Sequence, residues 1–503
     1  MALIKIPLLP GIFKDDTPLS AEGRFVDADK VRFVQGRPQT IGGWESVTTD
    51  TVDGVCRGIH TWADTAGERQ IGLGTHSHLY AYQGGAVYDI TPAGLAAGLV
   101  DGLGGAGFGT GAYGSGTYGA ASTGDVFPRT WSLDNWGEYL IANPRGGKIY
   151  EWRLDGGAAA AGIAGAPDRA NAVFVTPERQ LVVVGCTNLD GAFDPMCVRA
   201  SDIEDNTEWT PSATTSAVQR VLSGGSRLVR GLASRGINLI WSDTHLFGMR
   251  YVGDPPLVFS FATLGGNCGL LGPNAVTLAG GSAYWLAPNG QFFVWAGGEP
   301  QAIPCTLRRD VMDNLAAAQG DKVFAASVTQ YGEIWWFYPD ARDGNEVSRY
   351  VAYNHLEGHW TCGSFDRTAF TDAKAFDYPI GVSAGGRIYF HERGFSADGG
   401  AFSWRFESAP IDIGDGSSLM AVRSVIPDTE DQQGTFSLSL SGRAYPPSGA
   451  RMAGPYTVGP ATGKVDTRIA ARQVALAFAG SAAPCFLRLG ALRLDLVETG
   501  QRR

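Results

Sequence analysis

The stretch GSAYWLAPNGQFFVWAGGEP (281–300) decides the fold class, because it places Pro288-Asn289-Gly290 between two segments rich in aromatic residues. Asn-Gly supplies the positive backbone angles that a tight hairpin requires, and aromatic residues favour strands. The stretch therefore predicts a β-hairpin. An isolated hairpin of this size cannot bury its own apolar face, so it needs neighbours of the same kind.

Similar hairpin-like stretches recur at intervals of roughly 40 to 60 residues, which is close to the length of a four-stranded propeller blade. A β-sandwich would show closely spaced turns without this longer interval. We therefore predict an all-β protein whose body, residues 56–406, is a β-propeller of six or seven repeats. One short helix is expected at 310–318. The further repeats lie at 73–92, 137–157, 179–202, 237–254, 332–365 and 385–394.

The last part of the chain, residues 407–503, alternates apolar and polar residues, as in RQVALAFAG and CFLRLGALRLDLVE. This period of two is typical of half-buried antiparallel sheets, and we predict a C-terminal β-sandwich platform. Residues 1–55 are interpreted as an N-terminal arm and hairpin that join this platform. In the hairpin, Val31 and Phe33 share one strand face, and Gln35-Gly36 supplies the turn.

Residues 94–124 interrupt the repeats with a glycine-rich tract that includes GTGAYGSGTYGAASTG. Such a tract gains too little from packing to offset its chain entropy, so it predicts a loop inserted between the first two repeats. Its GxGxxG matches lack the flanking strand and helix of a dinucleotide site, and no cofactor is expected. The candidates for a gate or docking contact in this loop are Phe108, Tyr113 and Tyr118.

The composition excludes several classes of protein. With 44% hydrophobic residues the chain of 503 residues is globular, and its net charge of −10 opposes a surface that binds nucleic acid or anionic membranes throughout. Seven cysteines without a CxxC pair indicate reduced thiols and synthesis in a cytoplasm. Neither a signal peptide nor a membrane-spanning segment is expected.

No arrangement of residues predicts catalysis or metal binding. His355 and His359 flank Glu357 in what reads as a hairpin turn instead of a helix, and His76 and His78 lack an identifiable third ligand. The carboxylates inside the repeats occur in turn-like strings. We therefore expect a protein that is not an enzyme and holds no metal.

Two groups of charged residues remain as candidates for contacts between molecules. The densest basic stretch within the repeats contains Arg220, Arg227 and Arg230, which read either as surface arginines or as contacts to phosphates or an acidic subunit. The N-terminal hairpin has a face of alternating charge that predicts either a subunit contact or a solvated surface. The subunit-interface candidates are Arg24, Asp27, Asp29, Lys30, Arg32 and Arg37.

The sequence also resembles a known family, the tail nozzle proteins of short-tailed bacteriophages, also called tail tubular protein B-like or packaged-DNA stabilisation proteins. The resemblance rests on PLLPGIFKDDTPLSAEGRFVDADKVRFVQGRPQTIGGW near the start and on the glycine and tyrosine tract before PRTWSLDNWGEYLIANPRGGKIYEW. It continues in YVAYNHLEGHWTCGSF and in the closing RLGALRLDLVETGQRR. These segments are spread over the whole chain.

This resemblance implies a structural virion protein, without catalytic residues, that is made in the bacterial host cytoplasm. It implies a ring, commonly a hexamer, attached below the portal and its adaptor ring, which retains packaged double-stranded DNA and conducts it during ejection. Its further implied partners are tail fibre or tip proteins. The alternative is a receptor- or glycan-binding propeller, possibly hydrolytic, at a tail tip or cell surface. In that case Trp295, Trp335 and Trp336 would be sugar platforms, whereas their place inside hairpin strands favours the core.

Overall fold

The computed structural model describes residues 2–15, 17, 20–103, 126–254, 257–412, 418–445 and 448–500. Within these residues the chain is almost entirely β-strand, as the repeats predict. The helix expected at 310–318 is α1 (Arg308–Asn314), followed by the 3₁₀ turns η1 (Ala317–Lys322) and η2 (Thr329–Tyr331). The all-β prediction is confirmed.

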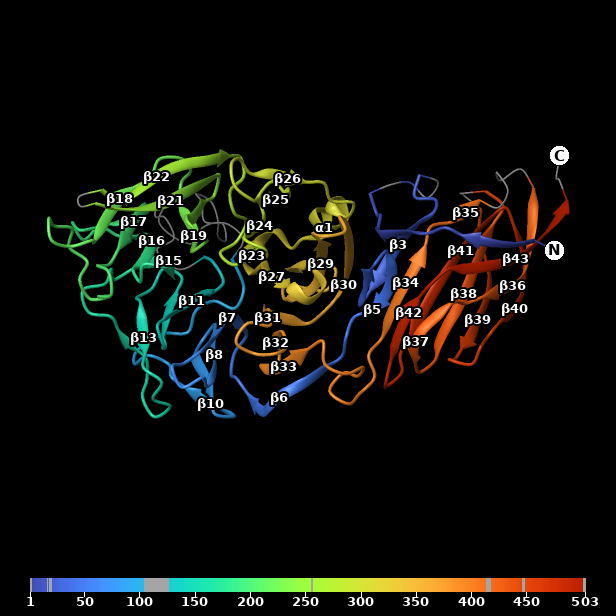
Figure 1. Ribbon diagram of the computed structural model, residues 1–503, viewed down its shortest axis with the longest axis horizontal. Helices are drawn as coiled ribbons and strands as arrows, with labels where there is room; N and C mark the ends of the chain where they lie inside the picture. The colour runs from blue at the N-terminus through green and yellow to red at the C-terminus, as the bar shows by residue number, and fades with distance from the viewer. Residues whose placement is uncertain are drawn as a thin grey trace, which may run out of the picture.

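Nine sheets in the described residues are four-stranded and antiparallel, and seven of them surround a common axis as the blades of a β-propeller (Figure 1). In the first six blades the strands follow each other along the chain, with the first strand innermost. The first three blades are β7 (Cys56–Ala63), β8 (Arg69–Thr75), β9 (Leu79–Gln83), β10 (Ala86–Asp89); β11 (Trp131–Trp136), β12 (Tyr139–Pro144), β13 (Tyr150–Trp152), β14 (Ala161–Gly162); and β15 (Ala170–Val175), β16 (Leu181–Thr187), β17 (Phe193–Ala200), β18 (Val218–Val221).

The next three blades repeat this arrangement, and each uses Gly or Asn residues with positive φ in its turns, for example Gly290. Their strands are β19 (Leu228–Leu232), β20 (Asn238–Ser242), β21 (His245–Asp254), β22 (Leu257–Gly266); β23 (Val276–Ala279), β24 (Ser282–Leu286), β25 (Phe292–Trp295), β26 (Gln301–Ile303); and β27 (Phe324–Val328), β28 (Glu333–Pro339), β29 (Val347–Asn354), β30 (His359–Ser364).

The seventh blade joins both ends of the propeller. Its inner strands are β31 (Arg367–Thr371), β32 (Ile380–Ser383) and β33 (Arg387–His391), and its outer strand is β6 (Trp44–Thr51), which pairs antiparallel with β33. The predicted boundary at residue 55 is therefore wrong for β6, which belongs to the propeller. This pairing covers the free edge of β33 and connects the last blade directly to β7 of the first, so the ring is closed by hydrogen bonds.

Apolar side chains of facing blades pack against each other around the ring. Between the seventh and first blades, Ile380 and Val382 meet Ile71 and Leu73, all fully buried. Further clusters fill the spaces between the first and second, second and third, third and fourth, and sixth and seventh blades. Trp295, Trp335 and Trp336 are 8%, 2% and 0% exposed, which confirms that they belong to the core.

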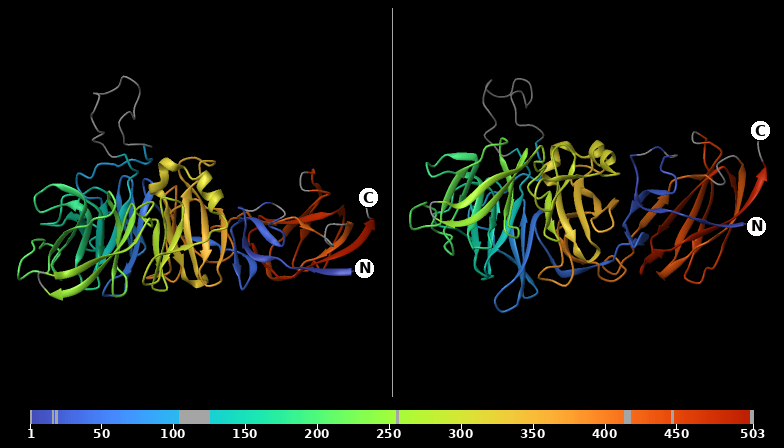
Figure 2. Two further views of the ribbon diagram at one scale, coloured as in Figure 1. Left: turned by 90° about the horizontal axis from the view of Figure 1, so that it is seen from above. Right: turned by 45° about the horizontal axis from the view of Figure 1, so that its top comes forward.

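The platform is a β-sandwich made from both ends of the chain, as predicted, and both termini lie at its outer end (Figure 2). Its strand β34 spans the predicted boundary at 406/407, so the platform begins slightly earlier. The three sheets contain β1 (Ala2–Ile6), β43 (Leu492–Gly500), β36 (Leu419–Ile426), β40 (Val465–Ala471); β2 (Leu9–Ile12), β3 (Arg24–Asp29), β34 (Trp404–Ser408), β41 (Gln473–Gly480), β38 (Phe436–Arg443), β39 (Arg451–Val458), with β35 (Ile411–Asp412) on β41; and β37 (Thr429–Gln433), β42 (Phe486–Leu489), β5 (Arg37–Thr40), β4 (Val31–Val34).

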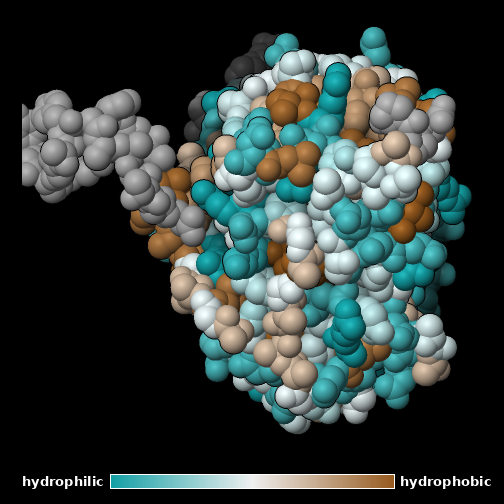
Figure 3. Space-filling view, turned by 90° about the vertical axis from the view of Figure 1, so that its left-hand side faces the viewer, coloured by the Kyte–Doolittle hydropathy of each residue, from teal (hydrophilic) through white to brown (hydrophobic). Residues whose placement is uncertain are grey.

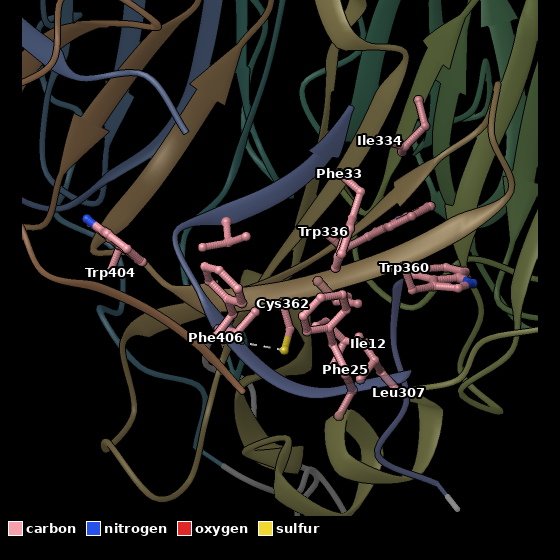
Figure 4. Packing of buried hydrophobic residues seen from close by; sticks show 14 of the residues in the cluster. Ile12, Phe25, Phe33, Leu307, Ile334, Trp336, Trp360, Cys362, Trp404 and Phe406 are labelled. Atoms are coloured by element: carbon pink, nitrogen blue, oxygen red, sulfur yellow. Dashed lines mark hydrogen bonds between the residues drawn. The ribbon is translucent and has the colours of Figure 1, made fainter. Parts of the chain in front are cut away.

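The platform and the propeller share one hydrophobic core. Phe25 and Phe33 of the platform pack in the same cluster as Trp336, Trp360 and Cys362 of the sixth blade, as Figure 4 shows. Strands β2, β3 and β4 lie against β30. Because burying such large aromatic surfaces is strongly favourable, the two parts are held together by packing as well as by chain connections.

Candidate functional site

The centre of the propeller contains a cavity of about 330 Å³, lined by all seven inner strands. This volume lies within the range of small-molecule sites and is far too small for a DNA duplex. The residues just before the inner strands mark one end of the cavity, where Asn274 Nδ2 donates to the carbonyls of Arg57 (3.1 Å) and Trp131 (3.5 Å). We call this end the strand-start end.

A charge network of two buried cations and two partly exposed carboxylates occupies the strand-start end. Arg57 donates two hydrogen bonds of 2.6 Å to the carboxylate of Glu346, while Lys322 donates to Asp101 and to the carbonyl of Asn345. Burial would raise the pKa of Glu346, but the hydrogen bonds and charge of Arg57 hold it below its usual value. Burial lowers the pKa of Lys322 although Asp101 opposes the shift. The cations here are therefore each matched by a carboxylate.

Residues at this end of the cavity also bind the described start of the glycine-rich insertion. Gly102 exchanges two hydrogen bonds with the side chain of Gln319, at 2.8 and 3.0 Å. The two flanks of the insertion pair with each other, since Leu103 N donates to Val126 O and Arg129 N to Leu99 O. The described flanks of the insertion thus lie across the strand-start end of the cavity.

Replacing Lys322 with methionine is expected to loosen these flanks. The substitution removes the cation that binds Asp101, so the peptides covering 99–103 and 126–129 should exchange amide hydrogen at least several-fold faster. Hydrogen exchange followed by mass spectrometry measures this change. Lys148→Met is the matched control, because Lys148 is exposed and pairs with exposed Asp168. Equal exchange in both variants would contradict this role of Lys322.

The titratable side chains that line the opposite end of the cavity, the strand-exit end, are His60, Asp134, Arg230, Asp372 and Lys374. His60 Nε2 lies 2.9 Å from Asn135 Oδ1 and 3.9 Å from Asp134 Oδ1. Burial lowers the pKa of His60 more than Asp134 raises it, so the imidazole is neutral at pH 7. Arg230 comes from the basic stretch noted in the sequence, but its side chain lines the cavity instead of the outer surface.

The predicted subunit-interface residues lie largely at the junction between platform and propeller of the same chain. Asp29 is buried and accepts hydrogen bonds from the backbone and hydroxyl of Ser364 in the sixth blade. Asp27 pairs with Lys14 (2.9 Å) and Arg405 (2.8 Å), and Lys30 pairs with Asp29. These charges already have partners within the chain, so their alternation does not mark an outward-facing surface.

Arg32 departs furthest from the prediction, because its side chain is fully buried. Its guanidinium donates two hydrogen bonds of 2.7 Å to Glu392, lies 3.2 Å from Glu333 and stacks on the Tyr331 ring at 3.7 Å. The interface prediction is therefore wrong for Arg32: the strand face opposite Val31 and Phe33 is covered by blades six and seven. Nothing in a single strand's pattern distinguishes a solvated charged face from one buried against carboxylates.

The remaining two candidates of this set are less enclosed. Arg37 is exposed on β5, and half-buried Arg24 lies over the Phe13 ring at 4.0 Å. The role of Glu357 was not predicted from the sequence. Its carboxylate accepts hydrogen bonds from the backbone N–H groups of Gln35 (2.9 Å) and Gly36 (3.0 Å) and so binds the turn of the platform hairpin. His355 and His359 flank it at the turn between β29 and β30, as expected.

Other predictions have mixed outcomes. Phe108, Tyr113 and Tyr118 lie outside the described residues. In the part of the chain that the structure covers, no group of three His, Cys, Asp or Glu side chains could hold a metal ion, and no helix is long and apolar enough to cross a membrane. All seven cysteines are free, and six of them are buried.

No protein-family description and no curated protein matches this chain. Among solved structures it is similar to the β-propeller domain of Cps50 (Swd1) from Myceliophteria thermophila, with 10% identity over 71% of this chain and 99% of that one and a TM-score of 0.39. It is also similar to BamB from Moraxella catarrhalis (12%, 69% and 97%, TM-score 0.34) and virginiamycin B lyase from Staphylococcus aureus (9%, 70% and 99%, TM-score 0.41). At these identities and TM-scores the similarity carries no argument about this chain, and the assignment of a β-propeller rests on the seven blades of its own structure.

Proposed function

We propose that this chain is a structural subunit that assembles through its platform into a ring, the nozzle of a short bacteriophage tail. The ring would sit below the portal and adaptor, retain packaged DNA and conduct it during ejection. Tail fibre or tip proteins would bind further out. The sequence resemblance supports this role, which requires no catalytic residue.

The observation that carries the proposal is the edge of the platform. Strand β1 ends its sheet, and its outer side has no strand partner among the described residues. Leu3 and Ile4 are 56% and 41% exposed on it. Because adjacent residues point to opposite faces, apolar surface is exposed on both faces of an unpaired edge. Such an edge invites pairing with another chain, and a neighbouring subunit in a ring would cover it.

The platform sheet that begins with β2 offers a second edge at its last strand, β39. Strand β39 ends that sheet and exposes Met452 to 67%. Two different edges on one platform suit head-to-tail contacts, which generate closed rings when the rotation between subunits permits.

The propeller would form the outer body of each subunit. Its own cavity is too small for duplex DNA, so DNA would pass through the lumen of the ring. A net charge of −10 on each subunit disfavours adhesion of DNA phosphates to the wall. The propeller face farthest from the platform is largely hydrophilic with separate hydrophobic spots (Figure 3), as suits a surface in water.

Light scattering and negative-stain imaging of the purified chain, alone and with portal complexes, test this proposal. We expect a ring from the wild-type chain. The double variant Leu3→Lys/Ile4→Lys should remain monomeric, because charge on both faces of β1 opposes pairing. Leu356→Lys is the control, since Leu356 is 74% exposed but lies in a propeller turn.

A wild-type chain that stays monomeric even with portal complexes would contradict the ring. If that monomer bound host polysaccharide, the receptor-binding alternative would replace it. Rings from the double variant would show that β1 is not the contact.

A further inference from the structure

Arg230 has one unsatisfied guanidinium nitrogen at the propeller cavity. It lies on the inner strand β19, lines the cavity, and its Nη1 atom is buried without a hydrogen-bond partner among the described residues. Burial of this charge lowers the pKa of Arg230 to about 10, with only partial compensation from Asp134. Burying a cation with incomplete compensation is costly, so a site that binds an anion would explain why an arginine stands at this position.

The carboxylates near Arg230 are engaged elsewhere. Asp134 accepts the backbone N–H groups of Val175 (2.8 Å) and Asn135 (2.9 Å), and it forms no ion pair with Arg230 in the described residues. Asp372 accepts hydrogen bonds from Ser327 (2.9 Å) and from the backbone and hydroxyl of Thr329. These bonds hold both carboxylates against the ends of inner strands.

The other groups at this end favour an anion. Lys374 is exposed just after β31, and Arg235 is exposed in a hollow that shares Ala233 and Leu278 with the cavity. Neutral His60 adds no charge but can exchange a hydrogen bond. Exposed cations at the opening would draw an anion toward the deeper Arg230.

The wall of the cavity is also apolar in part. Ile59, Leu232 and Leu278 are half-buried and line it from three different blades. A purely inorganic anion would leave this surface without contacts. An anionic group attached to a short apolar body would satisfy Arg230 and fill the remaining space.

We propose that the propeller cavity is a binding site for a small organic carboxylate. Its carboxylate accepts hydrogen bonds from Arg230, and its apolar body contacts Ile59, Leu232 and Leu278. This site is independent of the ring, since it lies inside a single propeller.

Isothermal titration of the full chain tests the site with sodium butanoate, butylammonium chloride and inorganic phosphate as probes. We expect butanoate to bind at one site per chain and butylammonium not to bind. Arg230→Met should weaken butanoate binding by about tenfold or more, because the bidentate partner is lost. The melting temperature of Arg230→Met should equal or exceed that of the wild type, because a buried charge that Asp134 compensates only in part is removed.

Arg235→Met is the matched control, an exposed arginine in the hollow beside the cavity, and it should retain binding within about twofold. Failure of butanoate to bind would overturn the proposal. Binding of phosphate alone would overturn the organic class of ligand, and wild-type affinity in Arg230→Met would overturn the assignment of Arg230.

Discussion

Replacing Arg32 with methionine is expected to lower the free energy of unfolding by about 3–5 kcal/mol, because it leaves two buried carboxylates without their cation. Glu333 and Glu392 both contact the Arg32 guanidinium, at 3.2 and 2.7 Å. The loss should appear as a lower urea midpoint, followed by tryptophan fluorescence. It should also loosen the platform, since Arg32 lies on the platform hairpin and both carboxylates lie in the propeller.

The size of this loss should depend on pH. In the wild-type chain, burial raises the pKa of Glu333 above 4.5 although Arg32 opposes the shift. A carboxyl with a raised folded pKa binds more protons in the folded state, so its contribution to stability falls as pH rises above the unfolded value. Without Arg32 the pKa rises further. The deficit of Arg32→Met should therefore be small near pH 4 and grow toward pH 8.

Two controls separate the lost ion pairs from general disruption of the hairpin. Arg37→Met changes an exposed arginine of the same hairpin and should alter stability by no more than about 0.5 kcal/mol. Adding Glu333→Gln and Glu392→Gln to Arg32→Met should restore much of the loss, because the buried negative charges are removed as well. Equal midpoints for Arg32→Met and Arg37→Met at pH 8 would contradict the assignment.

Gly386→Ala is expected to open the seventh blade. Gly386 has φ +78° in the turn between β32 and β33, and an added Cβ would lie 2.1 Å from the carbonyl oxygen of Val52, just after β6. The positive φ costs about 1–2 kcal/mol for alanine, and displacement of the backbone adds about 1–3 kcal/mol. We expect a total loss of about 3 kcal/mol, measured by thermal unfolding.

Gly67→Ala provides the matched control, because Gly67 has φ +83° with no atom within 4 Å of the added Cβ. Gly67→Ala should lose only the stability that alanine costs at a positive φ. Limited proteolysis should release the segment containing β6 more readily from Gly386→Ala than from Gly67→Ala. Equal melting temperatures and equal proteolysis would show that contact with Val52 does not hold β6 in place.

Several features of this protein were predictable because their causes are local. The Gln35-Gly36 turn forms as expected, with φ of 52° and 72°. Pro288-Asn289-Gly290 likewise joins two strands of one blade, and the burial of Trp335 and Trp336 follows from their place in strands. The alternation of apolar and polar residues after residue 407 predicted the sandwich, because a sheet with one buried face and one solvated face requires this pattern.

The sequence by itself determined the all-β class, the blade repeats and the two-part organisation, because strand periodicity and turn residues act over a few neighbouring positions. Only the tertiary structure decided that β6 completes the seventh blade, that Arg32 is buried between Glu333 and Glu392, and that Arg230 lines the cavity with its Nη1 atom unbonded among the described residues. These facts depend on which distant segments meet, over 300 residues apart for Arg32. An arginine on a strand has the same local pattern whether it faces water, a carboxylate or a cavity.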